Sequence, residues 1–127
     1  MASVTEWLSK ADGELAQAER AWKSGNAGRG RVGSRRAAGM ALKALLLLEP
    51  NEAYGTSFMH HLAGIADDSD IDGEVREAAW RLSARARPDA GWAHALPEPL
   101  TPMADATIIS EFAKARISQV SSGDQVP

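Results

Sequence analysis

Four arginines and four glycines are concentrated in one short segment, and together they offer chemistry that suits a phosphate group. The arginines are Arg29, Arg31, Arg35 and Arg36, and the glycines are Gly25, Gly28, Gly30 and Gly33. A guanidinium group donates to phosphate oxygens through a planar fork, and the free N–H groups at the start of a helix add further donors. The segment lacks the Gly-Lys-Ser/Thr ending of a P-loop, and no predicted strand precedes it. The pattern therefore predicts a basic loop that either binds phosphate or is simply solvated.

A second set of residues, Asp68, Asp70 and Asp72 before Gly73, matches the first half of a calcium-binding loop. Such a loop needs a bidentate glutamate at its twelfth position, and the residue there is Ala79. Asp72 can instead cap the helix that follows, because its side chain can accept from free backbone N–H groups. Since the missing glutamate removes oxygens from the metal shell, the sequence predicts no metal site and no cofactor.

His60 and His61 are the third group that could do chemistry, at the start of a predicted helix. Adjacent side chains on a helix point about 100° apart, so the two imidazoles cannot easily bind one metal ion. Neither histidine has an acid or a second histidine four residues later, which a zinc site on one helix face would need. These observations favour a helix-surface or capping role for His60, and ligand binding is the alternative role of this candidate residue.

The composition indicates one ordinary globular domain with an uneven distribution of charge. The 127 residues carry a formal net charge of −3, with 44% hydrophobic and 24% charged residues. Seven cations and no acid lie between Arg20 and Lys43, whereas six acids and only one cation, Arg76, lie between Asp67 and Glu77. The sequence thus predicts a positive surface and a separate negative one.

The absence of cysteine excludes disulfides, thiolate nucleophiles and cysteine-based zinc sites. Together with an N-terminus that lacks the apolar core of a signal peptide, it points to the cytoplasm. The longest apolar run, Leu45 to Leu48 with the alanines before it, is far too short to span a bilayer. We therefore expect no association with a membrane.

Helical periodicity places the candidate residues on elements. A first helix opens with the capping box Ser3-Val4-Thr5-Glu6 and carries an apolar seam as far as Trp22, before Gly25 stops it. A second runs from about Arg31 or Ser34 to Glu49 and ends at Pro50. Its stretch 37–48 is apolar all round except for Lys43, which predicts a helix buried at the centre of a bundle or in a dimer interface.

Three more helices follow. The third carries Phe58, Leu62 and Ile65, the fourth runs from Val75 to Ala86 before Pro88, and the last starts at Pro102 and extends to Val120. Residues 88–100 are predicted to be an irregular crossing, and 121–127 a flexible tail. The sequence thus predicts an all-α fold, an antiparallel up-and-down bundle of four to five helices in a single domain over residues 1–120.

These helices resemble the HEPN family over nearly the whole chain. Residues 7–20 are similar to its first-helix pattern W-L-x-K-A-x-x-D-L-x-x-A, and residues 35–46 to its segment Q-Q-A-A-E-K-A-L-K-A-L-L. His60-His61-Leu62 falls where the family often has H-D-L, and residues 85–89 fall where it has R-Y-P-D. Residues 105–117 are like the closing Ala-rich helix of the family. The order and spacing of these segments carry the resemblance.

The resemblance implies a helical bundle that commonly forms homodimers and works with nucleotides or RNA, often beside a small nucleotidyltransferase. Arg35, Arg36, Gly39 and Met40 replace the usual Gln, Gln, Glu and Lys of the family, so its fold transfers better than its function. We expect a non-enzymatic binding module, dimeric, that binds nucleotide or RNA phosphate or a nucleotidyltransferase partner. The alternative from another class is a structural or assembly subunit without a ligand.

A ribonuclease toxin of a toxin–antitoxin pair is the other alternative. Some members of the HEPN family cleave RNA without metal through an Arg-x4–6-His motif, and Arg87 and His94 fit that spacing. His94 would act as a general acid or base near neutral pH, and Arg87 would stabilise the charge that develops on phosphorus.

We predict that the purified protein does not cleave total RNA above background. Pro88 and Gly91 lie between Arg87 and His94, so the two side chains do not share one helix face, and a misplacement of about 1 Å can cost on the order of a hundredfold in rate. Metal-independent cleavage by the native chain, lost in Arg87→Ala and in His94→Ala variants that still fold, would contradict this prediction.

Overall fold

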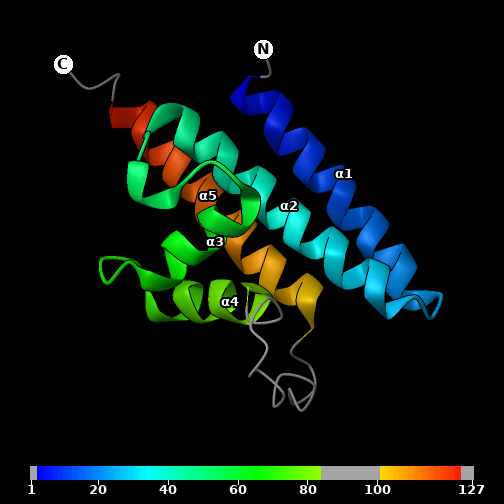
Figure 1. Ribbon diagram of the computed structural model, residues 1–127. Helices are drawn as coiled ribbons and strands as arrows, with labels where there is room; N and C mark the ends of the chain where they lie inside the picture. The colour runs from blue at the N-terminus through cyan, green and yellow to red at the C-terminus, as the bar shows by residue number, and fades with distance from the viewer. Residues whose placement is uncertain (1–2, 84–100, 124–127) are drawn as a thin grey trace.

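The computed structural model describes residues 3–83 and 101–123, and all of its regular structure is helical (Figure 1). The elements are α1 (Val4–Lys23), α2 (Ala27–Leu48), a short 3-10 helix η1 (Glu52–Tyr54), α3 (Phe58–Asp67), α4 (Gly73–Ser83) and α5 (Pro102–Gly123). No strand occurs in these ranges. The predicted all-α bundle is confirmed.

Helix α1 begins and ends as its sequence predicts. The Ser3 hydroxyl accepts from the Glu6 N–H at 3.1 Å, while the Glu6 carboxylate accepts from the Ser3 N–H, which completes the capping box. Gly25 adopts φ 92°, a left-handed conformation that a residue with a Cβ rarely takes, and so reverses the chain just after α1. Asn26 then caps α2, with its side chain accepting from the Arg29 N–H at 3.1 Å.

The composition of residues 25–34 predicts a loop or a frayed helix start, but helix α2 already begins at Ala27, so the loop is wrong and residues 27–34 are helical. The glycines of this segment lie on the helix because two of them let α1 come close. A Cβ built on Gly33 would lie 2.9 Å from the Ala18 Cβ, and one on Gly30 would lie 3.0 Å from the Trp22 ring. Their helix propensity is poor, but the absence of a side chain allows a close helix–helix contact.

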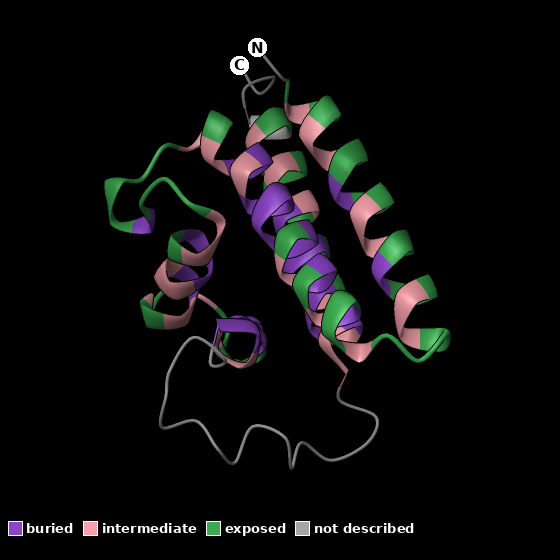
Figure 2. Ribbon diagram, turned by 45° about the vertical axis from the view of Figure 1, so that its right-hand side comes forward, coloured by how far each residue is buried: buried purple, intermediate pink, exposed green. Residues whose placement is uncertain are grey.

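Helix α2 is the central element of the bundle (Figure 2). From Ala37 to Leu45 every residue except Lys43 is buried by helices of the same chain, and the exposed large apolar residues of α2 are Val32 near its start and Leu47 and Leu48 at its end. Of the two interpretations of this stretch, a core helix or a dimer interface, the structure gives the first. A homodimer remains a prediction, and its contact must lie elsewhere.

The ion pairs show how the long helices are oriented. Lys114 on α5 pairs with Asp12 on α1 at 3.0 Å, and Arg116 pairs with Glu49, the C-cap residue of α2, at 2.7 Å. The second half of α5 thus lies beside the first half of α1. The same half of α5 lies beside the C-terminal end of α2. Helix α5 is therefore antiparallel to α1 and runs in the same direction as α2, as Figure 1 shows.

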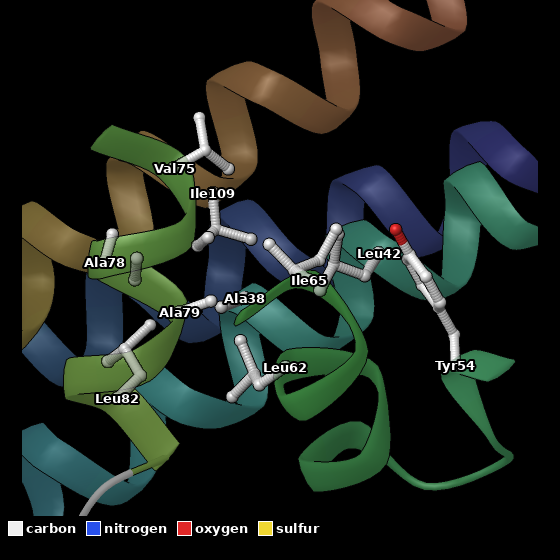
Figure 3. Packing of buried hydrophobic residues seen from close by; sticks show 11 residues of the cluster. Ala38, Leu42, Tyr54, Leu62, Ile65, Val75, Ala78, Ala79, Leu82 and Ile109 are labelled. Atoms are coloured by element: carbon white, nitrogen blue, oxygen red, sulfur yellow. The ribbon is translucent and has the colours of Figure 1, made fainter. Parts of the chain in front are cut away.

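Two apolar clusters hold these helices together. The larger one joins α2, η1, α3, α4 and α5, and includes Leu42, Leu62, Ile65 and Ile109 (Figure 3). The smaller one joins α1, α2 and α5. Its buried members are Ala11, Met40, Ala41, Leu45 and Ala113. Alanine supplies four of the eleven buried residues of the larger cluster and three of the five of the smaller one, which lets the helices approach closely around the larger side chains.

A buried ion pair fixes α4 against α5. The Arg81 Nη2 lies 2.7 Å from Oδ1 of Asp105, and these side chains are 15% and 2% exposed. The hydrogen bonds to Asp105 raise the pKa of Arg81, which therefore stays charged. Removing either partner would leave an uncompensated buried charge, a change that typically costs 3–5 kcal/mol, so we regard the pair as structural.

Some predicted boundaries fall beyond the described residues. The structure describes α4 as far as Ser83, and the predicted crossing at 88–100 lies outside the described residues. Residues 121–123, predicted to be part of the tail, belong to α5, while 124–127 are not described. Within the described ranges, no helix combines the length and the apolar character that crossing a bilayer requires.

The Gly39→Ala substitution should destabilise the bundle. Gly39 lies against the first residue of α3, and its added Cβ would clash with the Phe58 side chain and lie only 3.0 Å from the Phe58 Cα. Overpacking of this kind typically costs about 1–3 kcal/mol, more than the gain of about 1 kcal/mol from replacing a helical glycine by alanine. Chemical denaturation measures the change in the free energy of unfolding.

The matched control is Gly28→Ala on the same helix. The nearest atom to its added Cβ is Oδ1 of Asn26 at 4.0 Å, so only the propensity gain remains and the variant should be as stable as the native chain or more so. Equal effects of the two substitutions would contradict the close contact between α2 and α3.

Candidate functional site

The turn between α1 and α2 carries a group of cations, which we call the cationic corner. It consists of Arg20 and Lys23 at the end of α1 and Arg29 and Arg31 at the start of α2. Arg20, Lys23 and Arg29 are exposed, and no described carboxylate lies within ion-pair distance of them. The corner therefore presents unneutralised positive charge to solvent.

An aromatic ring belongs to the same corner. The Arg31 guanidinium lies 5.6 Å from the centroid of the Trp22 ring, a cation–π arrangement that holds this side chain near the turn. The first N–H groups of α2 have no partners within the helix, and a Cβ on Gly28 would meet open space beyond the Asn26 side chain. Partial positive charge at the helix start adds to that of the arginines.

The four arginines predicted to form one patch divide between two roles. Arg35 donates from Nε to the Leu82 carbonyl oxygen of α4 at 2.8 Å, and Arg36 pairs with Glu14 of α1 at 2.9 Å. Of the four arginines in the predicted patch, only Arg29 and Arg31 belong to the cationic corner. Sequence reasoning missed Arg20 and Lys23, because they lie on the preceding helix; the run without acids from Arg20 onward was the signal that could have found them.

An open, acid-lined groove lies at the other end of α2, around Tyr54. The Tyr54 hydroxyl donates to Oδ2 of Asp68 at 2.6 Å, and Oδ1 of Asp68 accepts from the Asp70 N–H at 3.0 Å. Burial and the nearby carboxylates raise the pKa of Tyr54, and the hydrogen bond from Tyr54 lowers the pKa of Asp68. The phenol thus stays protonated, and Asp68 stays ionised.

The three aspartates of the calcium-like motif have separate surroundings. Both oxygens of Asp68 accept the hydrogen bonds just described, and the backbone carbonyl of Asp72 accepts from the Arg76 N–H, so α4 begins directly after Asp72. Among the described residues, no three His, Asp or Glu side chains are placed to hold a metal ion. These aspartates act in the turn and at the helix start.

The two adjacent histidines have opposite environments. His60 is exposed and lines the groove beside Asp67 and Asp68, and its N–H is capped by the Ser57 hydroxyl at 3.1 Å. His61 is 1% exposed, and its Nδ1 donates to the Tyr54 carbonyl oxygen at 2.8 Å. The buried Nε2 of His61 has no hydrogen-bond partner among the described residues.

Arg87 and His94, the candidate nuclease pair, lie outside the described residues, as does the rest of 84–100. Among the described residues, we find no arrangement of a nucleophile, a base and an orienting group. The charged surfaces that the described residues do form are the cationic corner and the acidic groove.

Comparison with known proteins finds no relative of this chain. No protein-family model, no curated protein and no solved structure matches the chain. The resemblance to the HEPN family therefore rests on the sequence motifs alone.

The buried histidine should make stability sensitive to pH. Burial, first of all, lowers the pKa of His61 below its ordinary value, and the charge of Lys43 lowers it further. A depressed pKa means that the neutral form stabilises the fold at pH above about 6.5, and this contribution is lost as the pH falls through the folded-state pKa. The free energy of unfolding should fall between pH 7 and pH 5, with a slope of at most about 1.4 kcal/mol per pH unit from this residue.

The matched pair of variants is His61→Asn and His60→Asn. Denaturant titrations over this pH range should show a shallower dependence for His61→Asn than for His60→Asn, because asparagine does not titrate and only His61 is buried. An unaltered pH dependence in His61→Asn would contradict a buried neutral imidazole.

Proposed function

We propose that the chain is a non-enzymatic, HEPN-like helical module that binds the phosphate groups of RNA or of a nucleotide at the cationic corner. The observation that carries the proposal is that Arg20, Lys23 and Arg29 are exposed on the two helix ends that flank one turn, without a described carboxylate in ion-pair distance. Phosphate contacts of lysine and arginine supply most of the affinity for nucleic acids that does not depend on sequence.

The geometry of the corner favours an extended phosphodiester over a deeply bound small molecule. Its cations come from two helices and are spread over an exposed turn, so they can contact several phosphates of one strand. The Trp22 ring with Arg31 across it adds a partly exposed aromatic group, of the kind on which a nucleobase can stack. Single-stranded RNA is therefore the ligand that we favour.

The other expectations from the HEPN resemblance have less support. A nucleotidyltransferase partner or a homodimer would need a surface outside Ala37–Leu45, which the chain itself buries. The exposed large apolar residues of the described chain are Val32, Leu47 and Leu48, and they are available for such a contact. No described residue favours the ribonuclease.

The proposal predicts a change in the salt dependence of RNA binding. The variant Lys23→Ala/Arg29→Ala removes two exposed cations of the corner, so it should bind a labelled single-stranded RNA more weakly. The slope of log K against log salt concentration should become less steep by about 1.4, since each phosphate contact to a single strand contributes about 0.7. Fluorescence anisotropy over a series of salt concentrations measures both quantities.

The matched control is Lys10→Ala/Lys114→Ala, which removes the same charge from α1 and α5 away from the corner. If both double variants lose affinity equally, net charge alone explains binding. If neither changes the slope, the corner is only a solvated surface.

A further inference from the structure

The acidic groove at the end of α2 plays no part in the proposed binding of phosphate. It consists of two adjoining hollows that share Asn51, Tyr54, Asp68 and Asp70. The end of α2, η1, α3, the turn from α3 to α4, and α5 all contribute to its walls. The groove thus lies at the end of α2 opposite to the cationic corner.

The side chains that line the groove carry mostly negative charge. Its carboxylates are Glu49, Glu52, Asp67, Asp68, Asp70 and Asp72. The single guanidinium is that of Arg116, whose Nε and Nη2 donate to the two oxygens of Glu49 at 2.7 and 3.2 Å. The carboxylates of Asp70 and Asp72 accept no hydrogen bond from any described residue, so they are available to a cation from outside.

The floor of the groove is apolar. Leu46, Ile71 and Phe112 line it, and each of them is only partly buried while packing against the larger cluster. A free metal ion gains nothing from such a floor, and the thin methylene chains of a polyamine bury less apolar area there than a large apolar side chain does. Tyr54 and Asp68, joined by the hydrogen bond from the Tyr54 hydroxyl, line both hollows.

The groove is also open along its length, which bears on the kind of ligand. Small-molecule sites usually enclose most of the surface of their ligand, and an open groove does so poorly. A polypeptide segment needs no enclosure, because each side chain finds its own contact along the groove. Charge complementarity and the apolar floor therefore favour a basic segment that also carries a large apolar side chain.

We propose that this groove is the docking site for a basic segment of a partner polypeptide, in which arginine or lysine flanks a large apolar residue. The cations pair with Asp70 and Asp72, and the apolar side chain lies on Leu46, Ile71 and Phe112. The contact is independent of RNA binding at the other end of α2. It gives the module a second ligand of opposite charge to the first.

The test uses the full chain and a short, labelled peptide of arginine and leucine. We expect saturable binding, weakened about tenfold when serine replaces leucine in the peptide, as the loss of roughly one buried apolar side chain implies. The protein variant Asp70→Asn/Asp72→Asn should weaken binding of the original peptide about fivefold, since two exposed ion pairs are lost. The affinity of this protein variant for RNA should not fall. A failure of the docking proposal can therefore be told apart from a failure of RNA binding at the cationic corner.

The control variant Glu19→Gln/Glu111→Gln removes the same negative charge outside the groove and should bind the peptide as the native chain does. Three results would overturn the proposal. The first is equal weakening by the control variant, and the second is equal affinity for the serine peptide or for spermidine. The third is a self-association of the native chain that the groove variant abolishes while peptide binding stays unchanged, because the occupant would then be a second copy.

Discussion

The close approach of α1 to α2 is the contact on which the rest of the bundle depends. It depends on Gly33, where a Cβ would lie 2.9 Å from the Ala18 Cβ, and it leaves little room at Gly30, where a Cβ would lie 3.0 Å from the Trp22 ring. Once α1 covers this face, the other faces of α2 are left for α3, α4 and α5, and the helix becomes central (Figure 2). A helix surrounded in this way can be stable despite several glycines, because burial and packing outweigh their poor helix propensity.

This arrangement separates the charged surfaces of the protein. A helix as long as α2 spans about 33 Å at 1.5 Å per residue, so its two ends are far apart compared with the Debye length of about 8 Å at physiological salt. The cationic corner lies at one end and the acidic groove at the other. The two surfaces therefore neither neutralise each other nor compete for one ligand, although the net charge is only −3.

Features that depend on neighbours in the sequence were predictable, and features that depend on contacts between helices were not. The capping box at Ser3, the stop at Gly25 and the end of α2 before Pro50 are set by local backbone chemistry, and all three were predicted. The glycine segment was predicted to be a loop or a frayed helix start, because its composition shows the poor helix propensity of glycine but not the close contact with Ala18 that compensates for it. The distinction between exposed His60 and buried His61 likewise depends on the backbone carbonyl of Tyr54, which no spacing rule reveals.

The central claim is that the glycine and arginine segment is a packed helix from Ala27 onward and not an irregular loop. Amide hydrogen exchange, measured residue by residue by NMR, tests it most directly, because helical amides in a buried contact exchange through opening of the fold. The N–H groups of residues 31–36 should exchange as slowly, within about tenfold, as those of residues 37–45. Fast exchange over 31–36, near the rate of an unstructured peptide, together with slow exchange over 37–45, would contradict the account.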